Sequence, residues 1–377
     1  MIKWFYKYGF IILLLNTILY SIDLNLDNKP DYKFLADIIF YLVMGLGSLV
    51  LFISPSQIKD VVFHKSFVFL LLINLLNIIY FIFIEDQYNK ESFYFLISKF
   101  IQFFLISLAI YHNYDYYKNR FPSLIIYSIS FVILLGFFFN LDIFSGLYNG
   151  VFWNRNMLAS LTGIGFVFLL LGTEYRISKN LKIILFILMI LISILTGTRT
   201  VFIFIAFALL YKYGFSIRNI VYSILGLVLL LSVQHRVLYS DLDRVSQWQA
   251  AIYNIKANPW FGYGLLEYDG DLEELSEYKD YEEIYGGAHN AYLSFFIQYG
   301  VIFGSLIIFI IIRKSLLLFY RLYYISHRRI YMCIVIITLV ASMFETFMTG
   351  INEFQTVLFW FSLSFLSYSK FLEDYAD

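Results

Sequence analysis

The sequence predicts an all-α protein that lies in a membrane, with about 12 transmembrane helices and one large loop outside the bilayer. Of its 377 residues only 14% are charged and 60% are hydrophobic, whereas a soluble domain carries about 25% charged residues. The hydrophobic residues occur in runs comparable to the roughly 20 residues with which a helix crosses a bilayer. Because the net charge is zero, the composition gives no argument for a nucleic-acid partner. We expect one integral membrane domain over 1–377.

Several of the expected helices in the middle of the chain are short, which favours tilted or broken helices. Lys3 and Lys7 precede the first apolar segment, and no small-residue cleavage pattern follows it. We therefore expect a retained first helix rather than a signal peptide. The apolar segments are 8–24, 34–54, 61–84, 93–111, 122–140, 155–172, 181–196, 200–213, 216–233, 290–312, 330–349 and 353–369.

The distribution of basic residues predicts the orientation. With the N-terminus in the cytoplasm, the cytoplasmic segments hold 17 of the 27 basic residues, nine lie outside, and Lys99 falls within a span. Cytoplasmic loops of membrane proteins carry an excess of Lys and Arg. Both termini are therefore expected on the cytoplasmic side of a multi-pass protein, and the long loop is expected outside.

The outer loop, 234–288, carries 11 acidic and four basic residues. It begins with a stretch that predicts a helix, since Asp241 or Asp243 can cap it and Pro259 follows its end. An acidic stretch, 267–283, follows and is expected to be irregular. Apolar residues at helical spacing give the predicted helix one apolar face, formed by Val245, Trp248, Ile252 and Ile255.

Few charged residues lie inside the apolar segments, and the three that we single out are Asp37, Lys99 and Glu345. Each lies nearer the outer end of its segment than the centre. Ion-coupled transporters usually have ionisable groups or broken helices near the midplane, so this pattern favours a site at the outer membrane–water boundary. Pairing of Glu345 with an outer arginine would keep the carboxylate charged at that depth.

Two outer arginines are candidate ligands for a phosphate group. Arg199 lies in "LTGTRTVF", a turn between two apolar runs, and Arg244 lies one turn before Trp248. A planar guanidinium can bind two phosphate oxygens at once. For Arg199 the alternative is a snorkelling side chain that fixes a helix end. For Arg244, a position near the lipid headgroups competes with a solvated helix that carries a salt bridge to Asp241.

His289 is the sharpest candidate for catalysis, because it lies in "GGAHNAYL" where the outer loop enters an apolar helix. A histidine titrates near neutral pH and can take a proton from a hydroxyl. Asn290 can orient this histidine or a substrate, and the alternative is a helix-capping His-Asn pair. Asn154 and Asn156, in "NGVFWNRNMLAS", stand at the outer mouth of another apolar run and predict hydrogen bonds between helices or to a ligand.

The sequence contains no pattern for a metal or a nucleotide cofactor. The outer histidines lack the spacing of a zinc helix, the acidic loop lacks the calcium-loop pattern, and no Walker or dinucleotide glycine motif occurs. The lone Cys333 is expected to be a small buried hydrophobe.

Four of these stretches, in order, resemble the O-antigen ligase and polymerase family of bacterial surface-glycan assembly. They are "GVFWNRNMLA", "TGTRT", "RVSQWQAAIYNIKANPWFGYGL" and "HNAYLSFFIQYGVIFG". The resemblance covers 149–313, the expected catalytic region, whereas the first 140 residues match only by hydrophobicity. Arg155 stands where the family often has proline, so the local geometry there is expected to differ.

The resemblance implies a GT-C-like membrane glycosyltransferase fold and a bacterial cytoplasmic membrane location with the active site facing outward. It implies glycan transfer from an undecaprenyl-diphosphate carrier without a metal or cofactor. Carried over, Arg199 and Arg244 would bind the diphosphate, and His289 would activate or position the acceptor hydroxyl, with inversion at the anomeric centre. The supporting residues would be Asn154, Asn156, Trp248, Asn290 and Glu345.

The expected function is polymerisation of lipid-linked repeat units into O-antigen, capsular or other surface polysaccharide. The expected partners are the lipid-linked donor and acceptor, the bilayer, and possible chain-length regulator and flippase proteins. The runner-up is the ligase of the same family, which moves finished glycan to lipid A–core, and a protein-glycosylating transferase is a third relative. A glycolipid flippase or other transporter is the alternative of another class, and it predicts ionisable residues along a central path.

Overall fold

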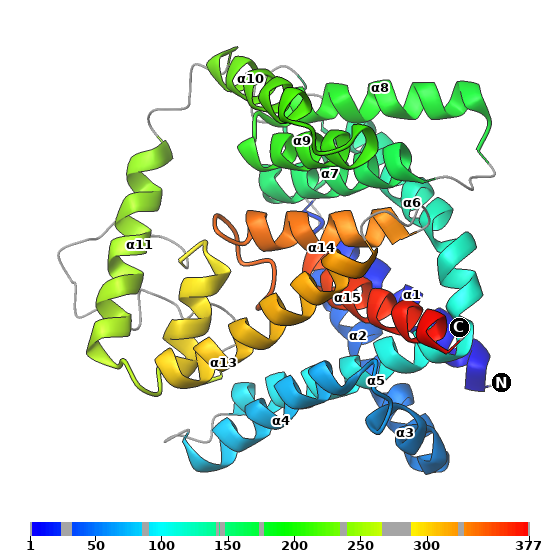
Figure 1. The fold of residues 1–377 in the computed structure, drawn as a ribbon, viewed down its shortest axis with the longest axis vertical. Coiled ribbons are helices and arrows are strands. Elements are labelled where there is room, and N and C mark those ends of the chain that lie inside the picture. Colours follow the sequence, from blue (N-terminus) through cyan, green and yellow to red (C-terminus); the bar gives the residue numbers. More distant parts are fainter. Residues whose placement is uncertain are drawn as a thin grey trace.

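The computed structural model describes residues 2–23, 32–84, 90–140, 143, 148–172, 177–233, 240–265, 288–322 and 328–375. Side chains are described for these residues except 2, 91, 226–233 and 240–244. Over these ranges the protein is all-helical and contains no strand, as predicted. One isolated β-bridge joins Ile22 to Phe152. Figure 1 shows the arrangement of the helices.

The first helices lie within residues 1–140. They are α1 (Ile2–Tyr20), α2 (Tyr32–Ile53), α3 (Pro55–Val62), α4 (Val68–Phe83), α5 (Lys90–Asn119) and α6 (Phe121–Phe139). The later helices are α7 (Arg155–Leu171), α8 (Lys179–Thr196), α9 (Arg199–Tyr213), α10 (Ile217–Val233), α11 (Ser240–Ala257), α13 (Ala291–Leu322), α14 (Arg329–Ala341) and α15 (Phe354–Asp374).

Within the described ranges, five helices are long and apolar enough to cross a membrane: α2, α5 from Ser92, α6, α8 and α13. Three shorter apolar helices, α4, α7 and α14, accompany them. The helices therefore indicate a multi-pass membrane protein. The start of α1 and the end of α15 lie on the same side of the molecule (Figure 1).

Each predicted apolar segment contains a helix, but several segments differ from their helices in extent. The segment 61–84 is interrupted by a turn before α4 begins at Val68. The segment 330–349 is helical only to Ala341, and irregular backbone follows over 342–353. Irregular backbone within a membrane protein needs partners from the protein itself, and this stretch has them, as the site shows.

A break divides α13 at Gly300, where φ is 66° and ψ is 179°. The segment after α11 supplies partners for the backbone groups that the break frees. The Val301 N–H donates to the Pro259 carbonyl at 2.8 Å, the Tyr263 N–H donates to Ile297 at 2.9 Å, and the Gly264 N–H donates to Gln298 at 3.1 Å. We call this contact of 259–264 with the α13 break the interlock.

Two glycines make the interlock possible. A Cβ on Gly262 would lie 2.4 Å from the Ile297 carbonyl oxygen, and one on Gly300 would lie 2.3 Å from the Trp260 carbonyl oxygen. Both residues have φ values near 70°, a region open to glycine at little energy. The Tyr80 hydroxyl of α4 completes the contact, since it lies 2.5 Å from the Phe261 carbonyl and 2.9 Å from the Gln298 carbonyl.

The loop helix α11 exists and ends before Pro259, as predicted. Its predicted apolar face is divided. Val245 is 50% exposed and Ile252 is 43% exposed, whereas Trp248 packs near Phe344 and Ile255 packs against the cluster that contains Ala251. The buried residues of the helix are Gln247, Ala251 and Asn254. The small Ala251 lets α11 approach α13 closely, in a cluster with Ala288 and Ile297. The acidic stretch 267–283 lies outside the described residues.

Candidate functional site

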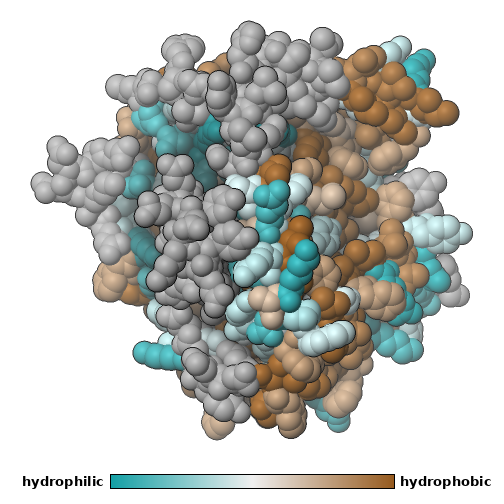
Figure 2. Space-filling view, turned by 90° about the vertical axis from the view of Figure 1, so that its left-hand side faces the viewer, coloured by the Kyte–Doolittle hydropathy of each residue, from teal (hydrophilic) through white to brown (hydrophobic). Residues whose placement is uncertain are grey.

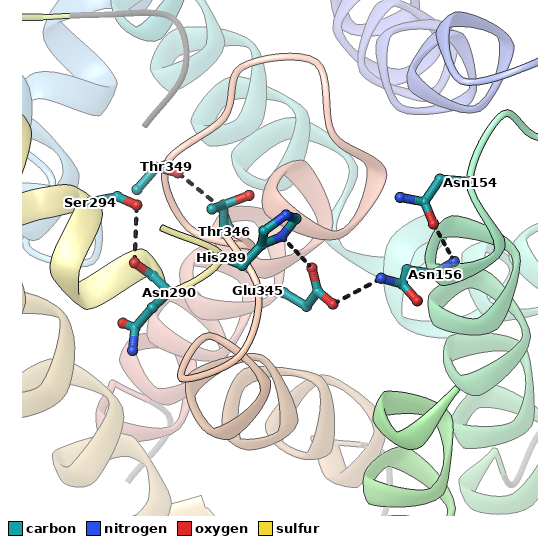
Figure 3. Close-up of polar contacts among 8 residues, drawn as sticks. All are labelled: Asn154, Asn156, His289, Asn290, Ser294, Glu345, Thr346 and Thr349. Atoms are coloured by element: carbon teal, nitrogen blue, oxygen red, sulfur yellow. Dashed lines mark hydrogen bonds and ion pairs between the residues drawn. The ribbon is translucent and has the colours of Figure 1, made fainter. Parts of the chain in front are cut away.

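The central polar contact joins three residues from three parts of the chain (Figure 3). The Nδ1 of His289 lies 3.5 Å from Oε2 of Glu345. The amide Nδ2 of Asn156 donates a hydrogen bond of 3.3 Å to the other carboxylate oxygen, Oε1. The Glu345 side chain is 10% exposed and that of His289 is 31% exposed. One shielded carboxylate therefore bridges an amide and an imidazole that still meets solvent.

His289 has an unusual backbone conformation, with φ at 43°. Few non-glycine residues adopt a positive φ, although histidine tolerates it better than most. On one side the chain is held by the buried Ala288, and on the other by Asn290, whose Oδ1 accepts from the backbone N–H groups of Tyr292 and Leu293 at 3.0 and 3.2 Å. The helix-capping role thus belongs to Asn290, and His289 projects from the preceding turn.

Glu345 comes from the irregular segment 342–353. The Ala291 N–H, in the first turn of α13, donates to the carbonyls of Ser342 and Glu345 at 2.9 and 3.2 Å. This bond ties the segment of Glu345 directly to the residue two positions after His289. The side chains of His289 and Glu345 therefore meet because the first N–H of α13, which does not bond to the Asn290 cap, donates to carbonyls of the irregular segment.

Lys99 holds the far end of the same segment. Its Nζ donates to the Gly350 carbonyl at 2.6 Å, and Nε2 of Gln102, one turn later on α5, donates to the Ile351 carbonyl at 2.9 Å. The ammonium thus has a local hydrogen-bonding role that its position within an apolar segment did not reveal. Lys99 and Gln102 thus supply hydrogen-bond donors to backbone carbonyls of 342–353, which backbone N–H groups would supply if this segment were helical.

Asn154 and Asn156 begin α7. Asn154 caps the helix, because its Oδ1 accepts from the backbone N–H of Asn156 at 2.8 Å. The preceding turn is fixed by Asn149, which accepts from Asn140 at 2.7 Å and donates to the Phe152 carbonyl at 2.6 Å. This network directs the Asn156 side chain toward Glu345, which lies in the irregular segment 342–353 rather than in a helix.

Arg199 is the first residue of α9 and is half-buried. Gly197, at φ 62°, ends α8, and Thr198 leads into α9. The start of α9 lies beside the start of α7, since Ala159 packs with Val201 and Phe202. Arg199 and Asn156 therefore occupy neighbouring helix starts on one side of the molecule.

Arg244 belongs to the first turns of α11, but its side chain lies outside the described part of the structure. Trp248, one turn later, faces the site: its ring centroid lies 6.2 Å from that of Phe344, the neighbour of Glu345. The helix that carries Arg244 therefore contacts the segment that carries Glu345.

The arrangement suits proton transfer from a hydroxyl. The Glu345 carboxylate contacts the Nδ1 side of the imidazole and leaves Nε2 on the other side available to a substrate. The sequence had grouped Glu345 with the outer arginines, and its contact with His289 was missed because the two residues are distant in the chain. No group of three metal-binding side chains occurs among the residues that the structure describes.

Comparison with known proteins adds no relative to this description. No family model matches the chain, and no curated protein matches it. The family resemblance therefore stays a prediction, and the site must be judged by its geometry.

Proposed function

We propose that the protein is a membrane glycosyltransferase that joins lipid-diphosphate-linked oligosaccharide units into a surface polysaccharide. The observation that carries this proposal is the His289–Glu345–Asn156 contact at an end of the helix bundle. A histidine that is held by a shielded carboxylate and remains open to solvent is a suitable general base for a sugar hydroxyl.

The acceptor hydroxyl would approach Nε2 of His289. As the oxygen attacks the anomeric carbon, its proton passes to Nε2, and the carboxylate of Glu345 stabilises the resulting imidazolium. The bond from the anomeric carbon to the diphosphate oxygen breaks at the same time, and direct attack inverts the anomeric centre. A positioned base of this kind typically contributes about 10²–10⁴-fold to the rate.

The leaving group requires positive charge. Arg199, at the start of α9, is the described candidate for the diphosphate, and Arg244 is the second candidate from its place on α11. Guanidinium groups can bind two phosphate oxygens each, and stabilisation of the departing charge lowers the barrier. A site at the bilayer boundary would accept the lipid tail of the donor without removing it from the membrane.

A transporter is the alternative of another class, and one cavity bears on it. Between α4, α5, α13 and α15 lies a cavity of about 50 Å³ lined by Asn74, Asn77, Lys99, Gln102 and Gln298 among other residues. These polar side chains stand among a mostly apolar lining that includes Phe95, Phe103 and Trp360, and the volume suits a few water molecules rather than a sugar. The amine of Lys99 already donates to Gly350 there. The cavity therefore supports the enzyme over the transporter.

The test uses His289→Ala and Glu345→Gln in cells that make the cognate glycan, with protein levels confirmed. We expect His289→Ala to remove about 10²–10⁴-fold of the activity, and Glu345→Gln to remove less because the amide still contacts Nδ1. Electrophoresis of the surface glycan distinguishes the alternatives: a lost polymerase leaves single repeat units, and a lost ligase leaves bare lipid A–core.

The matched control is Asp374→Asn, which alters an exposed carboxylate near the end of α15, where it pairs with Lys370 at 3.7 Å. It should leave the glycan ladder unchanged. A normal ladder in His289→Ala cells would contradict the proposal.

A further inference from the structure

The helix α11 has three faces of different character. Gln247, Ala251 and Asn254 are buried toward α13. On one flank lie Val245 and Ile252, both exposed, followed around the helix by the partly buried Trp248. At about 100° per residue, the other exposed residues follow Val245 around the helix in the order Lys256, Gln249, Tyr253 and Ala257, and Ala257 lies about 120° from Val245. The exposed surface of α11 thus has an apolar edge beside Trp248 and a far edge at Ala257, with Lys256 and Gln249 between them.

The orientation of α11 matches a position along a membrane surface. Its axis runs across the direction of α4, α8 and α14, at the end of the bundle opposite the two termini (Figure 1). Figure 2 looks onto this end, where hydrophobic side chains gather along the lower edge and the right-hand side, next to hydrophilic ones. A helix parallel to the bilayer plane is expected to have one flank toward lipid and one toward water.

The apolar surface continues from the interlock onto a helix that faces lipid. Trp260 is 63% exposed and Phe261 is exposed beside it. Through the bond from Tyr80 to the Phe261 carbonyl, this pair lies near the end of α4, where Ile82 and Phe83 are exposed. Trp and Tyr concentrate at membrane–water interfaces, and exposed aliphatic side chains on an apolar helix face the lipid.

We propose that α11, together with Trp260 and Phe261, rests in the outer interface of the bilayer, with Val245 and Ile252 in contact with lipid. The interlock fixes the depth of this anchor, because 259–264 is bonded to the break in α13. Where the proposed function holds, the anchor sets the first turns of α11, including Arg244, at the depth of lipid headgroups. The diphosphate of a lipid-linked donor lies at that depth.

The test measures where two positions of α11 lie. The full chain with Cys333→Ala, which removes its only cysteine, receives Ile252→Cys or Ala257→Cys, is spin-labelled and is reconstituted into phosphatidylglycerol–phosphatidylethanolamine vesicles. Oxygen concentrates in lipid and a nickel chelate stays in water, so their effects on the label report its depth. We expect an oxygen-to-nickel ratio several-fold higher at 252 than at 257.

Ile187→Cys, on the exposed side of the membrane-spanning α8, sets the lipid value. Val245→Cys repeats the measurement on the apolar flank if Ile252→Cys does not fold. Equal ratios on the two flanks, both high or both low, would overturn the proposal. The label measurement needs no enzyme activity, so the two failures are distinguishable. If the anchor is wrong, the oxygen-to-nickel ratios at 252 and 257 are equal. If the proposed function is wrong, His289→Ala cells keep a normal glycan ladder.

Discussion

Helical backbone gives way to irregular backbone at two places in this protein, the break in α13 at Gly300 and the segment 342–353 after α14. The first is satisfied almost entirely by backbone groups: three N–H···O=C bonds join 259–264 to the break, and two glycines allow the contact. The second is satisfied by side chains as well as by backbone groups: Lys99 and Gln102 bind the carbonyls of Gly350 and Ile351, and the Ala291 N–H binds the carbonyls of Ser342 and Glu345.

The difference shows two ways to keep polar backbone inside a bundle, with different consequences. Backbone bonds at a glycine contact leave no room for a side chain, so the interlock is a rigid joint between α11 and α13. Side-chain donors are longer and can release their acceptors one at a time. The catalytic candidate Glu345 belongs to the second kind of segment, whereas the anchor at Trp260 belongs to the first.

The largest effect is expected where the interlock is broken. In Gly262→Ala the new Cβ would meet the Ile297 carbonyl oxygen at 2.4 Å, and the residue would keep a positive φ. Displacement of the two backbones and the strained φ should lower the free energy of unfolding by about 3 kcal/mol or more. Denaturation of the purified protein in detergent measures this loss.

Gly45→Ala is the matched control for that change. Gly45 lies within α2, and a Cβ there meets nothing within 4 Å. Alanine is about 1 kcal/mol more favourable than glycine in a helix interior, so the control should be neutral or slightly stabilising. Equal destabilisation by both changes would show that the interlock is not a tight backbone contact.

The next effect concerns the segment 342–353. Lys99→Met removes the donor to the Gly350 carbonyl and keeps an apolar side chain of similar length. Hydrogen bonds from charged groups contribute about 1.5–3 kcal/mol, so we expect a loss in that range, concentrated in this segment. Hydrogen exchange should become faster over 342–353 and stay unchanged over 259–264, and exchange that rises equally in both would contradict the distinction between them.

Sequence reasoning predicted the regular parts of this fold well. The predicted segment 155–172 became α7, and the loop helix ended before Pro259, because apolar runs, caps and proline are local signals. The break at Gly300 was missed, since the apolar residues of "FFIQYGVIFG" continue through it without a change of composition. Its cause is a contact with 259–264, which no local pattern records.

For the candidate site, the sequence indicated the individual residues but not the contacts between them. His289, Asn156 and Glu345 were each singled out, but their mutual contact depends on how the start of α13 bonds to 342–353. The apolar face of α11 was predicted, yet its residues divide: Val245 and Ile252 are exposed, whereas Trp248 and Ile255 pack against the protein on the side near Ala251. Long-range packing of this kind leaves no signal in a single sequence.

The smallest effect is expected from removal of a side-chain hydroxyl that assists the interlock. Tyr80→Phe deletes the hydroxyl that reaches the carbonyls of Phe261 and Gln298 and leaves the backbone bonds intact. The loss of unfolding free energy should be about 1–2 kcal/mol, the contribution of a neutral hydrogen bond and the desolvation of its acceptor. Tyr41→Phe, at an exposed tyrosine of α2, is the control and should change nothing. If Tyr80→Phe were as damaging as Gly262→Ala, the interlock would depend on a side chain after all, and the two irregular regions would be held in the same way.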